Sequence, residues 1–233
     1  ASSSEENWQQ FKQGLHATDL AMQVVLPEMD GRIFTRAISF KCMAQFHEKT
    51  QMSIVCYQLH QERAQFVIEL AKSYLALANI ENKQKKIAII LANYPTKDGR
   101  IGNGVGLDTP QSCVSILHAL KKAGYSLSDI PASGNQLIER LLQSVTNNPN
   151  SLHFLPCWQS ISVEDYNLQF EQLPVDSQQQ VLSRWGTIEK DVKYRQGRIM
   201  IAGIRLQDVF VGIQPARGYN LDLSANYHDP DLI

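Results

Sequence analysis

The sequence predicts an α/β fold, with a mixed or partly parallel sheet flanked by helices. Residues 87–92 form an apolar run with the length of a buried strand, and a glycine-rich loop and a helix beginning near Thr109 follow it. Other strand-like and helical segments are interspersed along the chain. A chain that mixes the two kinds of element in this way usually packs helices against a sheet.

The first 80 residues predict short elements followed by one long helix. Residues 8–15 have the spacing of a short helix, residues 21–26 are an apolar run that predicts a strand ending at Pro27, and residues 54–57 predict another strand. Residues 61–78 predict an amphipathic helix, because apolar side chains recur there at helical spacing. These side chains are Phe66, Val67, Leu70, Ala71, Tyr74 and Leu75.

A polar stretch at residues 79–85 follows this helix and predicts a boundary. We expect an N-terminal α/β segment over residues 1–82 and a second α/β segment with the glycine-rich loop over residues 83–233. One continuous domain is the alternative.

The strand over residues 87–92 is apolar at almost every position, as expected for a strand that helices cover on both faces. Thr109 is predicted to be the N-cap of the next helix and Pro110 its first residue, and Gly124 ends it. The predicted inward face of this helix consists of Cys113, Ile116, Leu117 and Leu120.

The C-terminal third predicts more helices and strands. Residues 134–145 predict a helix, and residues 163–185 predict a helical segment interrupted at Pro174. Residues 198–204 and 208–213 predict two strands joined by a turn. The inward side chains of the first of these helices are predicted to be Leu137, Ile138, Leu141, Leu142 and Val145. Ligands of α/β proteins bind beyond the carboxyl ends of strands, so the loops over residues 94–109 and 214–219 are the candidate binding loops.

The glycine-rich loop contains Gly99, Gly102, Gly104 and Gly106. Glycine permits positive φ and close backbone approach, so the loop is predicted to leave N–H groups and the positive end of the helix free for an anionic ligand. The spacing differs from GxGxxG and no Gly-Lys-Ser/Thr follows, which excludes the usual dinucleotide and P-loop motifs. The alternative is a turn that only lets the strand and the helix pack.

The residues of this loop also resemble a known family. Residues 93–95 read Asn-Tyr-Pro and residues 98–110 read Asp-Gly-Arg-Ile-Gly-Asn-Gly-Val-Gly-Leu-Asp-Thr-Pro. They resemble the signature of the cobaltochelatase large subunit, whose family includes the porphyrin-binding subunit of magnesium chelatase, and the loop fits the cobalt branch better. Further segments agree in order, at residues 25–31, 185–186, 214–219 and 227–230. The resemblance implies that these 233 residues are an internal fragment of a larger multidomain chelatase subunit.

The resemblance also implies a function. Large subunits of this family are expected to bind the tetrapyrrole while cobalt, as substrate metal, is inserted into hydrogenobyrinic acid a,c-diamide during cobalamin biosynthesis. ATP is expected on AAA-type partner subunits and not on this chain. The expected partners are a corrin or porphyrin, these ATPase subunits and the remainder of the same large subunit. A magnesium chelatase H-type porphyrin-binding subunit and a non-catalytic docking module for the motor subunits are the alternatives. We expect the isolated fragment to be inactive.

The candidate substrate-binding residues follow from the resemblance and from their side chains. They are Arg100, Asn103, Gly104, Gly106, Asp108, Thr109, Gln214 and Arg217. Arg217 is suited to two parallel hydrogen bonds with a substrate carboxylate, although an ion pair with Asp222 or Asp229 is the structural alternative. Glu28 and His228 are the candidate metal ligands, and no catalytic base is assigned. For Glu28, a simple β-turn with Asp30 is the alternative.

Composition narrows the class of protein. The chain has 22 basic and 23 acidic residues and no long basic cluster, which argues against nucleic-acid and anionic-membrane binding. It has neither an apolar stretch of transmembrane length nor the apolar core of a signal peptide, so a cytoplasmic protein is expected. The four cysteines have no close spacing in the sequence, and we expect buried, reduced thiols in place of a zinc site or a disulfide framework.

Overall fold

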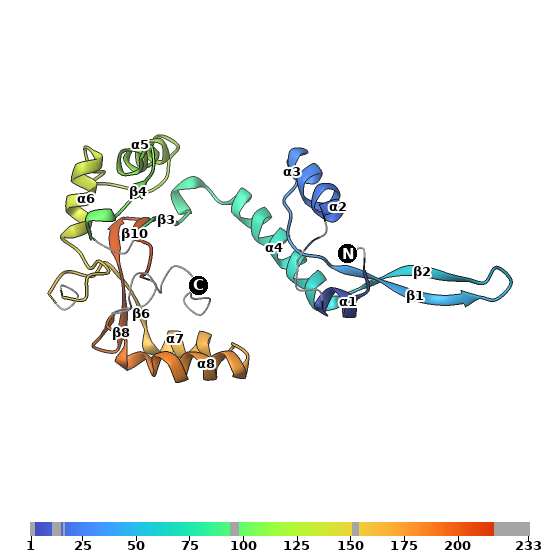
Figure 1. The fold of residues 1–233 in the computed structure, drawn as a ribbon. Helices are drawn as coiled ribbons and strands as arrows, with labels where there is room; N and C mark the ends of the chain where they lie inside the picture. Colours follow the sequence, from blue (N-terminus) through green and yellow to red (C-terminus); the bar gives the residue numbers. More distant parts are fainter. Residues whose placement is uncertain (1–2, 11–14, 16, 94–97, 151–153, 217–233) are drawn as a thin grey trace. The chain divides into compact units, whose positions relative to one another are not determined.

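The computed structural model describes residues 3–10, 15, 17–93, 98–150 and 154–216 (Figure 1). The chain divides into two compact units, Ala1–Ile80 and Glu81–Ile233. We refer to them as unit 1 and unit 2. The division lies two residues before the boundary expected from the sequence.

Unit 1 begins with short helices. Helix α1 spans Glu5–Gln10, and α2 (Ala17–Leu20), a π-helical turn (Ala21–Val25) and α3 (Leu26–Met29) follow one another directly. The strand predicted over residues 21–26 is therefore wrong. A short apolar run cannot be told from a helical segment by periodicity alone, and Pro27 lies in the first turn of α3, where proline is tolerated.

A long antiparallel hairpin follows, formed by β1 (Ser39–His47) and β2 (Met52–Leu59). β2 confirms and extends the strand predicted over residues 54–57, whereas β1 was not predicted. The register is irregular between Met43 and Gln45. Cys42 pairs directly with Cys56, and both residues are only partly buried, so the expectation of buried thiols is wrong for this pair. Spacing in the sequence does not reveal which residues face each other across a hairpin.

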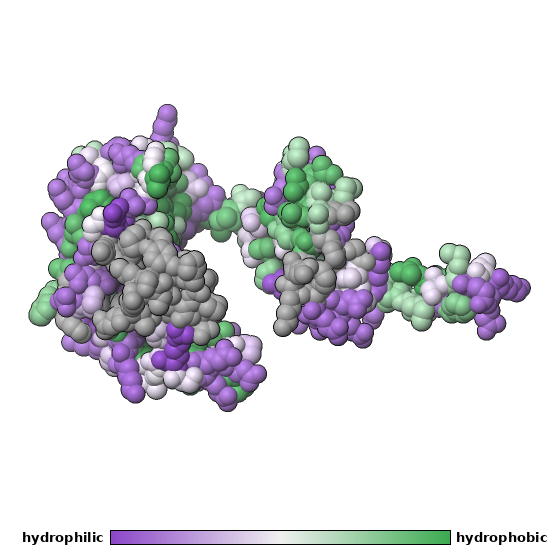
Figure 2. Space-filling view, in the orientation of Figure 1, coloured by the Kyte–Doolittle hydropathy of each residue, from purple (hydrophilic) through white to green (hydrophobic). Residues whose placement is uncertain are grey.

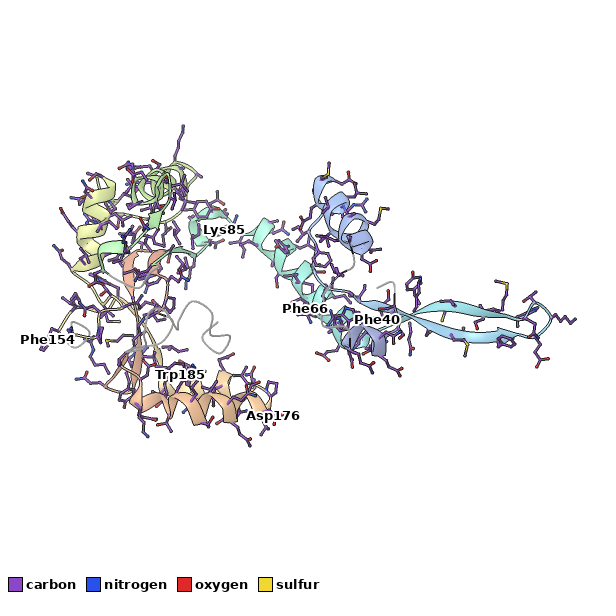
Figure 3. All side chains as sticks on the ribbon, in the orientation of Figure 1. Phe40, Phe66, Lys85, Phe154, Asp176 and Trp185 are labelled. Carbon is purple, nitrogen blue, oxygen red and sulfur yellow. The ribbon has the colours of Figure 1, made fainter. Side chains whose placement is uncertain are left out.

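Helix α4 (Gln61–Asn79) confirms the long helix predicted from residue 61. The ring of His60 caps it by accepting a hydrogen bond from the backbone N–H of Arg63. Phe40, labelled in Figure 3, is the one buried residue among the described residues of unit 1. The Trp8 ring lies 5.2 Å from it, and the Arg63 guanidinium lies 4.7 Å from the Trp8 ring. Unit 1 therefore has only a very small core of its own.

Unit 2 is built on a three-stranded sheet in the order β3-β10-β9. β3 (Ile87–Leu91) is parallel to β10 (Val209–Ile213), which is antiparallel to β9 (Gly203–Leu206). This confirms the mixed, partly parallel sheet. Gly203 allows the close approach of β9 to β10, because a Cβ atom there would lie within 2.4 Å of the Val211 carbonyl oxygen.

Helices α5 (Thr109–Lys122) and α6 (Gly134–Leu142) form the main core of unit 2 together with this sheet. The fully buried side chains of this core include Leu117, Leu137, Leu141, Val145, Val209 and Val211. Ile116 and Leu142, predicted to face inward, are 49% and 40% exposed. Ile90 is 55% exposed, so the expectation that helices cover both faces of β3 is also wrong.

A second sheet of unit 2 has the order β6-β8-β7, with antiparallel pairing throughout. Its strands are Gln159–Ser162, Arg198–Ile201 and Tyr194–Arg195. The strand predicted over residues 198–204 is thus two strands, β8 and β9, separated at Ala202. Helices α7 (Val163–Phe170) and α8 (Val175–Trp185) confirm the helical segment interrupted at Pro174. No helix in the described part of the chain is long and apolar enough to cross a membrane.

Candidate functional site

The glycine-rich loop first turns back onto the end of β3. Asn93 forms an antiparallel bridge with Ile101, and the Gly102 N–H donates to the Ala92 carbonyl oxygen at 2.7 Å. Gly102 has φ of 69° and is buried, and a Cβ atom there would lie 3.3 Å from Pro110. The loop is therefore anchored at residues 101 and 102. Arg100, just before this anchor in a 3₁₀ turn (Asp98–Arg100), is exposed.

The next six residues form a miniature hairpin. β4 (Asn103–Gly104) pairs with β5 (Leu107–Asp108), and Val105 and Gly106 form the turn between them. Gly106 has φ of 73°, which the third position of a type II turn requires. Val105 is fully exposed at the tip. The glycines thus build a projecting hairpin, and part of their backbone is already hydrogen-bonded within it.

The start of α5 differs from the sequence prediction. Asp108 is the N-cap, because its carboxylate accepts a hydrogen bond from the Gln111 N–H at 3.0 Å, and Thr109 is the first helical residue. The prediction that Thr109 caps the helix is wrong by one residue. The expectation that the positive helix end stays free for an anionic ligand is wrong as well, since the Asp108 carboxylate occupies it.

Three buried polar side chains and the half-buried Gln214 gather beside the loop, near the carboxyl ends of β3 and β10. We call Asn93, Asn147, Gln214 and Lys193 the amide cluster. The Asn93 N–H donates to the Gln214 side-chain oxygen at 3.4 Å, and the Asn147 side-chain amide donates to the Gln214 carbonyl oxygen at 2.7 Å. Lys193 Nζ donates to the Asn147 side-chain oxygen at 2.8 Å. These bonds make a continuous polar chain in the interior of unit 2.

Asn93 is the incompletely satisfied member of the cluster. Its side chain is 2% exposed, and neither Nδ2 nor Oδ1 has a hydrogen-bond partner among the described residues. An unpaired buried polar group costs about 1–3 kcal/mol of stability, so such groups are rare in native proteins. Asn93 therefore offers a ligand the two N–H donors of its Nδ2 and the Oδ1 acceptor.

Lys193 supplies a buried positive charge. The residue is 8% exposed, and burial lowers the pKa of its ammonium below the ordinary value of 10.5, while the nearby Asp191 carboxylate and the Cys157 thiol act in the opposite direction. The backbone carbonyl oxygen of Lys193 accepts from the Met200 N–H at 2.9 Å. Lys193 thus connects the second sheet of unit 2 to the amide cluster.

Apart from Glu28, the predicted site residues fall into three groups. Gln214 lies in the amide cluster. Six lie in or beside the glycine-rich loop: Arg100, Asn103, Gly104, Gly106, Asp108 and Thr109. Arg217 and His228 lie outside the described residues, as do Asp222 and Asp229.

Glu28, the other candidate metal ligand, is an exposed residue of α3 in unit 1. It lies in the last helical turn before Asp30 and Gly31, not in a turn after a strand. The described residues contain no group of three or more His, Cys, Asp or Glu side chains able to hold a metal ion. A metal site at Glu28 stays a prediction.

Sequence reasoning missed three members of the amide cluster. Asn93 carried a usable signal, because it is a polar residue directly after a buried strand. Asn147 follows the helix predicted over residues 134–145, and Lys193 lies in a segment without a predicted element. Asn147 and Lys193 join the cluster through a hydrogen bond between residues 46 positions apart in the sequence.

Two cavities lined by described residues lie away from the cluster. One cavity, of 540 Å³, lies on the exposed face of the first sheet and is lined by residues that include Ile90, Arg205 and Phe210. The other, of 340 Å³, is lined by residues that include Arg140 and Trp158. No residue of the amide cluster or of residues 98–109 lines either cavity.

Comparison with known proteins shows which family this chain resembles. The sequence model of the family described as CobN/Magnesium Chelatase matches residues 1–233. The aerobic cobaltochelatase subunit CobN of Pseudomonas aeruginosa is 52% identical over 97% of this chain, and that of Sinorhizobium sp is 42% identical over 99%. The chain spans 18% of the length of each of these relatives.

A more distant relative and a solved structure also match this chain. The magnesium-chelatase ChlH protein of Oryza sativa subsp. indica is 28% identical over 93% of this chain, which covers 15% of that protein. The structure of the catalytic subunit of cobaltochelatase from Mycobacterium tuberculosis matches with a TM-score of 0.76 and 31% identity, covering 99% of this chain and 19% of that one. Because the family model matches along the whole sequence, the chain belongs to the CobN/magnesium chelatase family.

Proposed function

We propose that this chain is part of the large, tetrapyrrole-binding subunit of a cytoplasmic, ATP-dependent metal chelatase of the cobalt type. The complete enzyme, a ligase that forms nitrogen–metal bonds, inserts cobalt into hydrogenobyrinic acid a,c-diamide in cobalamin biosynthesis. ATP is hydrolysed on AAA-type partner subunits. Identities of 52% and 42% to two cobaltochelatase subunits, against 28% to the magnesium-chelatase ChlH protein, support the cobalt branch.

The observation that carries the proposal for the site is the unpaired side-chain amide of Asn93. It lies at the carboxyl ends of parallel strands, where α/β proteins bind their ligands. A tetrapyrrole with acetamide and carboxylate side chains offers the donors and acceptors that Asn93 lacks. Both Asn93 side-chain atoms are buried, so the substrate reaches them only after a local opening.

The remaining contacts are assigned by their chemistry. Arg100 and Arg217 pair with substrate carboxylates, and Gln214 keeps Asn93 in position. The buried Lys193 attracts anionic substituents toward the cluster. The backbone around Gly104 and Gly106 and the side chains of Asn103, Asp108 and Thr109 form the rim of the site. Glu28 and His228 are proposed ligands of the entering metal.

In this proposal the chain contributes binding and orientation to metal insertion. The macrocycle must lose its pyrrolic N–H protons to a base as cobalt enters, and no residue of this chain is assigned as that base. Side-chain contacts hold the periphery of the ring, so that binding energy is available to fix and distort the reacting centre. A clamp of this kind needs neither a nucleotide site nor a resident metal.

Metal insertion by the full-length large subunit with its ATPase partners tests the function. We expect cobalt insertion into the metal-free corrin diamide and no magnesium insertion into protoporphyrin, both followed by absorbance. Magnesium insertion with no cobalt insertion would assign the protein to the other branch of the family.

A second candidate function, docking, is favoured by the surface of unit 1. Seven large apolar residues of the hairpin are between 47% and 68% exposed: Met43, Phe46, Met52, Ile54, Val55, Tyr57 and Leu59. Figure 2 shows apolar surface over α2 and α3 and along part of the hairpin of this unit. Exposed apolar area on this scale usually marks an interface. The remainder of the large subunit is the proposed partner, because this chain spans 18% of its relatives.

A further inference from the structure

The β1–β2 hairpin holds two cysteines directly opposite each other. Cys42 of β1 and Cys56 of β2 are paired in the register, and their Sγ atoms lie 2.7 Å apart. Both residues are partly exposed, so reagents in solution can reach them. The other two cysteines have different surroundings: Cys113 is buried in the core of unit 2, and the Cys157 thiol donates to the Gln159 carbonyl oxygen at 2.9 Å.

The hairpin geometry suits a covalent bond between these sulfur atoms. Facing residues of an antiparallel pair have Cα atoms about 4.5–5.5 Å apart. Disulfides span Cα separations of about 4.4–6.8 Å, so the pair lies in this range without any movement of the backbone. The strands thus hold the two thiols where a disulfide can form.

We propose that Cys42 and Cys56 are a reversible thiol oxidation site, which closes to a cross-strand disulfide when oxidised glutathione or a similar disulfide oxidant accumulates. One thiolate attacks the oxidant and forms a mixed disulfide, and the second thiolate then displaces the glutathione thiol. Two protein S–H bonds are lost and one S–S bond forms. The two electrons reduce one oxidised glutathione to two glutathione thiols, which take up the two protons. In a reducing compartment the pair remains as two thiols.

Oxidation would fix the hairpin at a specific place. The pair lies next to the irregularity between Met43 and Gln45, where the strands could otherwise change register. Isolated two-stranded hairpins are only marginally stable, so a covalent link strongly limits their motion. The apolar residues beyond the link, such as Met52 and Val55, would then be held in one arrangement. This inference does not depend on the proposed chelatase function.

The attack should be faster in alkaline solution. The hydrogen bond with Cys56 raises the pKa of the Cys42 thiol, which lowers its thiolate fraction at neutral pH. Since the thiolate is the nucleophile, raising the pH increases the rate.

Trypsin digestion after thiol blocking tests the proposal in the full-length subunit. Trypsin cuts after Lys41, Lys49 and Arg63, so Cys42 and Cys56 fall on separate peptides, residues 42–49 and 50–63. We expect these peptides to stay joined after equilibration with excess oxidised glutathione and to separate after reduction with dithiothreitol. Cys113 and Cys157 should not join each other or either member of the pair.

Two variants and one condition complete the test. Cys42→Ser should leave Cys56 able to form only a mixed disulfide with glutathione, and the matched Cys157→Ser should leave the joined peptides unchanged. At one fixed glutathione ratio, the joined fraction should fall several-fold in urea. Wild-type protein with glutathione on Cys56 and no joined peptides would overturn the proposal. So would an equal joined fraction in native and urea-unfolded protein.

Discussion

At the scale of single residues, the amide cluster is unusual because it places polar groups where a core would favour apolar ones. The other members of the cluster satisfy one another, whereas the Asn93 side-chain atoms lack partners among the described residues. A partly satisfied buried network is less stable than an apolar core of the same shape. We interpret the unpaired Asn93 amide as a sign of ligand binding.

Replacing Asn93 with leucine should therefore not destabilise unit 2. The variant removes an unpaired buried amide. Its free energy of unfolding should therefore be equal to that of the wild type or higher by up to about 1 kcal/mol. Urea unfolding followed by circular dichroism measures this. A loss of more than about 2 kcal/mol would instead indicate that Asn93 is a structural residue with bonds of its own.

The lowered pKa of Lys193 should make the stability of unit 2 depend on pH in a specific way. Its pKa in the folded state is lower than 10.5, chiefly because burial disfavours the charged form. At a pH between the folded-state pKa of Lys193 and its unfolded-state pKa of about 10.5, the unfolded chain binds more protons than the folded chain. The stability of unit 2 should therefore rise with pH in this range, and it should not depend on Lys193 at lower pH. Lys193→Met should remove this slope. Urea unfolding of both proteins over alkaline pH checks the difference, and identical slopes would contradict the assigned cause.

At the scale of elements, the glycine-rich loop combines an anchored base, a projecting hairpin and a capped helix. The base is fixed by the Asn93–Ile101 bridge, and Asp108 caps α5. The hairpin between them has the fully exposed Val105 at its tip. A change in the hairpin should therefore affect ligand contacts more than the core, and a change at the cap should do the reverse.

Gly106→Val tests the hairpin. Valine is strained at φ of 73°, and the usual cost is about 1–3 kcal/mol, confined here to the turn. We expect weaker corrin binding in a protein that still folds, with a free energy of unfolding of unit 2 lowered by no more than this strain. Gly99→Ala is the matched control, because Gly99 has no positive φ and no atom within 4 Å of an added Cβ. Unchanged corrin affinity in a folded Gly106→Val protein would exclude the hairpin from the site.

Asp108→Ala tests the cap. Loss of the 3.0 Å hydrogen bond to Gln111 should lower the stability of unit 2 by about 1 kcal/mol, as for other N-cap residues. Ser112→Ala, an exposed position of the same helix, should change it little. Chemical denaturation of the two variants compares them, and equal stability would show that Asp108 does not support α5.

Several elements were predictable from the sequence for clear reasons. The helix beginning at Gln61, the interruption at Pro174 and the partly parallel sheet around β3 follow from periodicity, proline chemistry and the order of segments. The segment before Pro27 was mistaken for a strand because four or five apolar residues fit both structures. The site was predictable only in part, since Asn147 and Lys193 join it through tertiary contacts that leave no local pattern.

At the scale of the whole molecule, the two units differ in how far they can support themselves. Unit 2 has an apolar core formed by its first sheet, α5 and α6, whereas Phe40 is the single buried residue described in unit 1. The large exposed apolar surface of unit 1 fits a segment that packs against the rest of a much longer subunit.

Docking of unit 1 can be measured as binding of this chain to a large subunit from which the same residues are deleted. Val55 is 57% exposed on β2, and Val55→Glu should weaken association of the two pieces by placing a charge in an apolar interface. Lys49→Glu, in the exposed turn of the same hairpin, should have little effect. Equal dissociation constants for Val55→Glu and wild type would remove the hairpin from the interface.

The isolated chain should also lack turnover. It has no Gly-Lys-Ser/Thr motif for nucleotide binding, so we expect neither ATP hydrolysis nor cobalt insertion from the 233 residues alone. Steady turnover by the purified chain after removal and return of cobalt would contradict this.

The affinity of the full-length large subunit for metal-free hydrogenobyrinic acid a,c-diamide tests the central claim most directly. Asn93→Leu removes the unpaired amide of the cluster, and Asn135→Leu makes the same change at an exposed position of α6. We predict that Asn93→Leu raises the dissociation constant by about 5- to 150-fold, the equivalent of about 1–3 kcal/mol, and that Asn135→Leu leaves it unchanged. A folded Asn93→Leu protein with wild-type affinity would show that the amide cluster does not bind the tetrapyrrole.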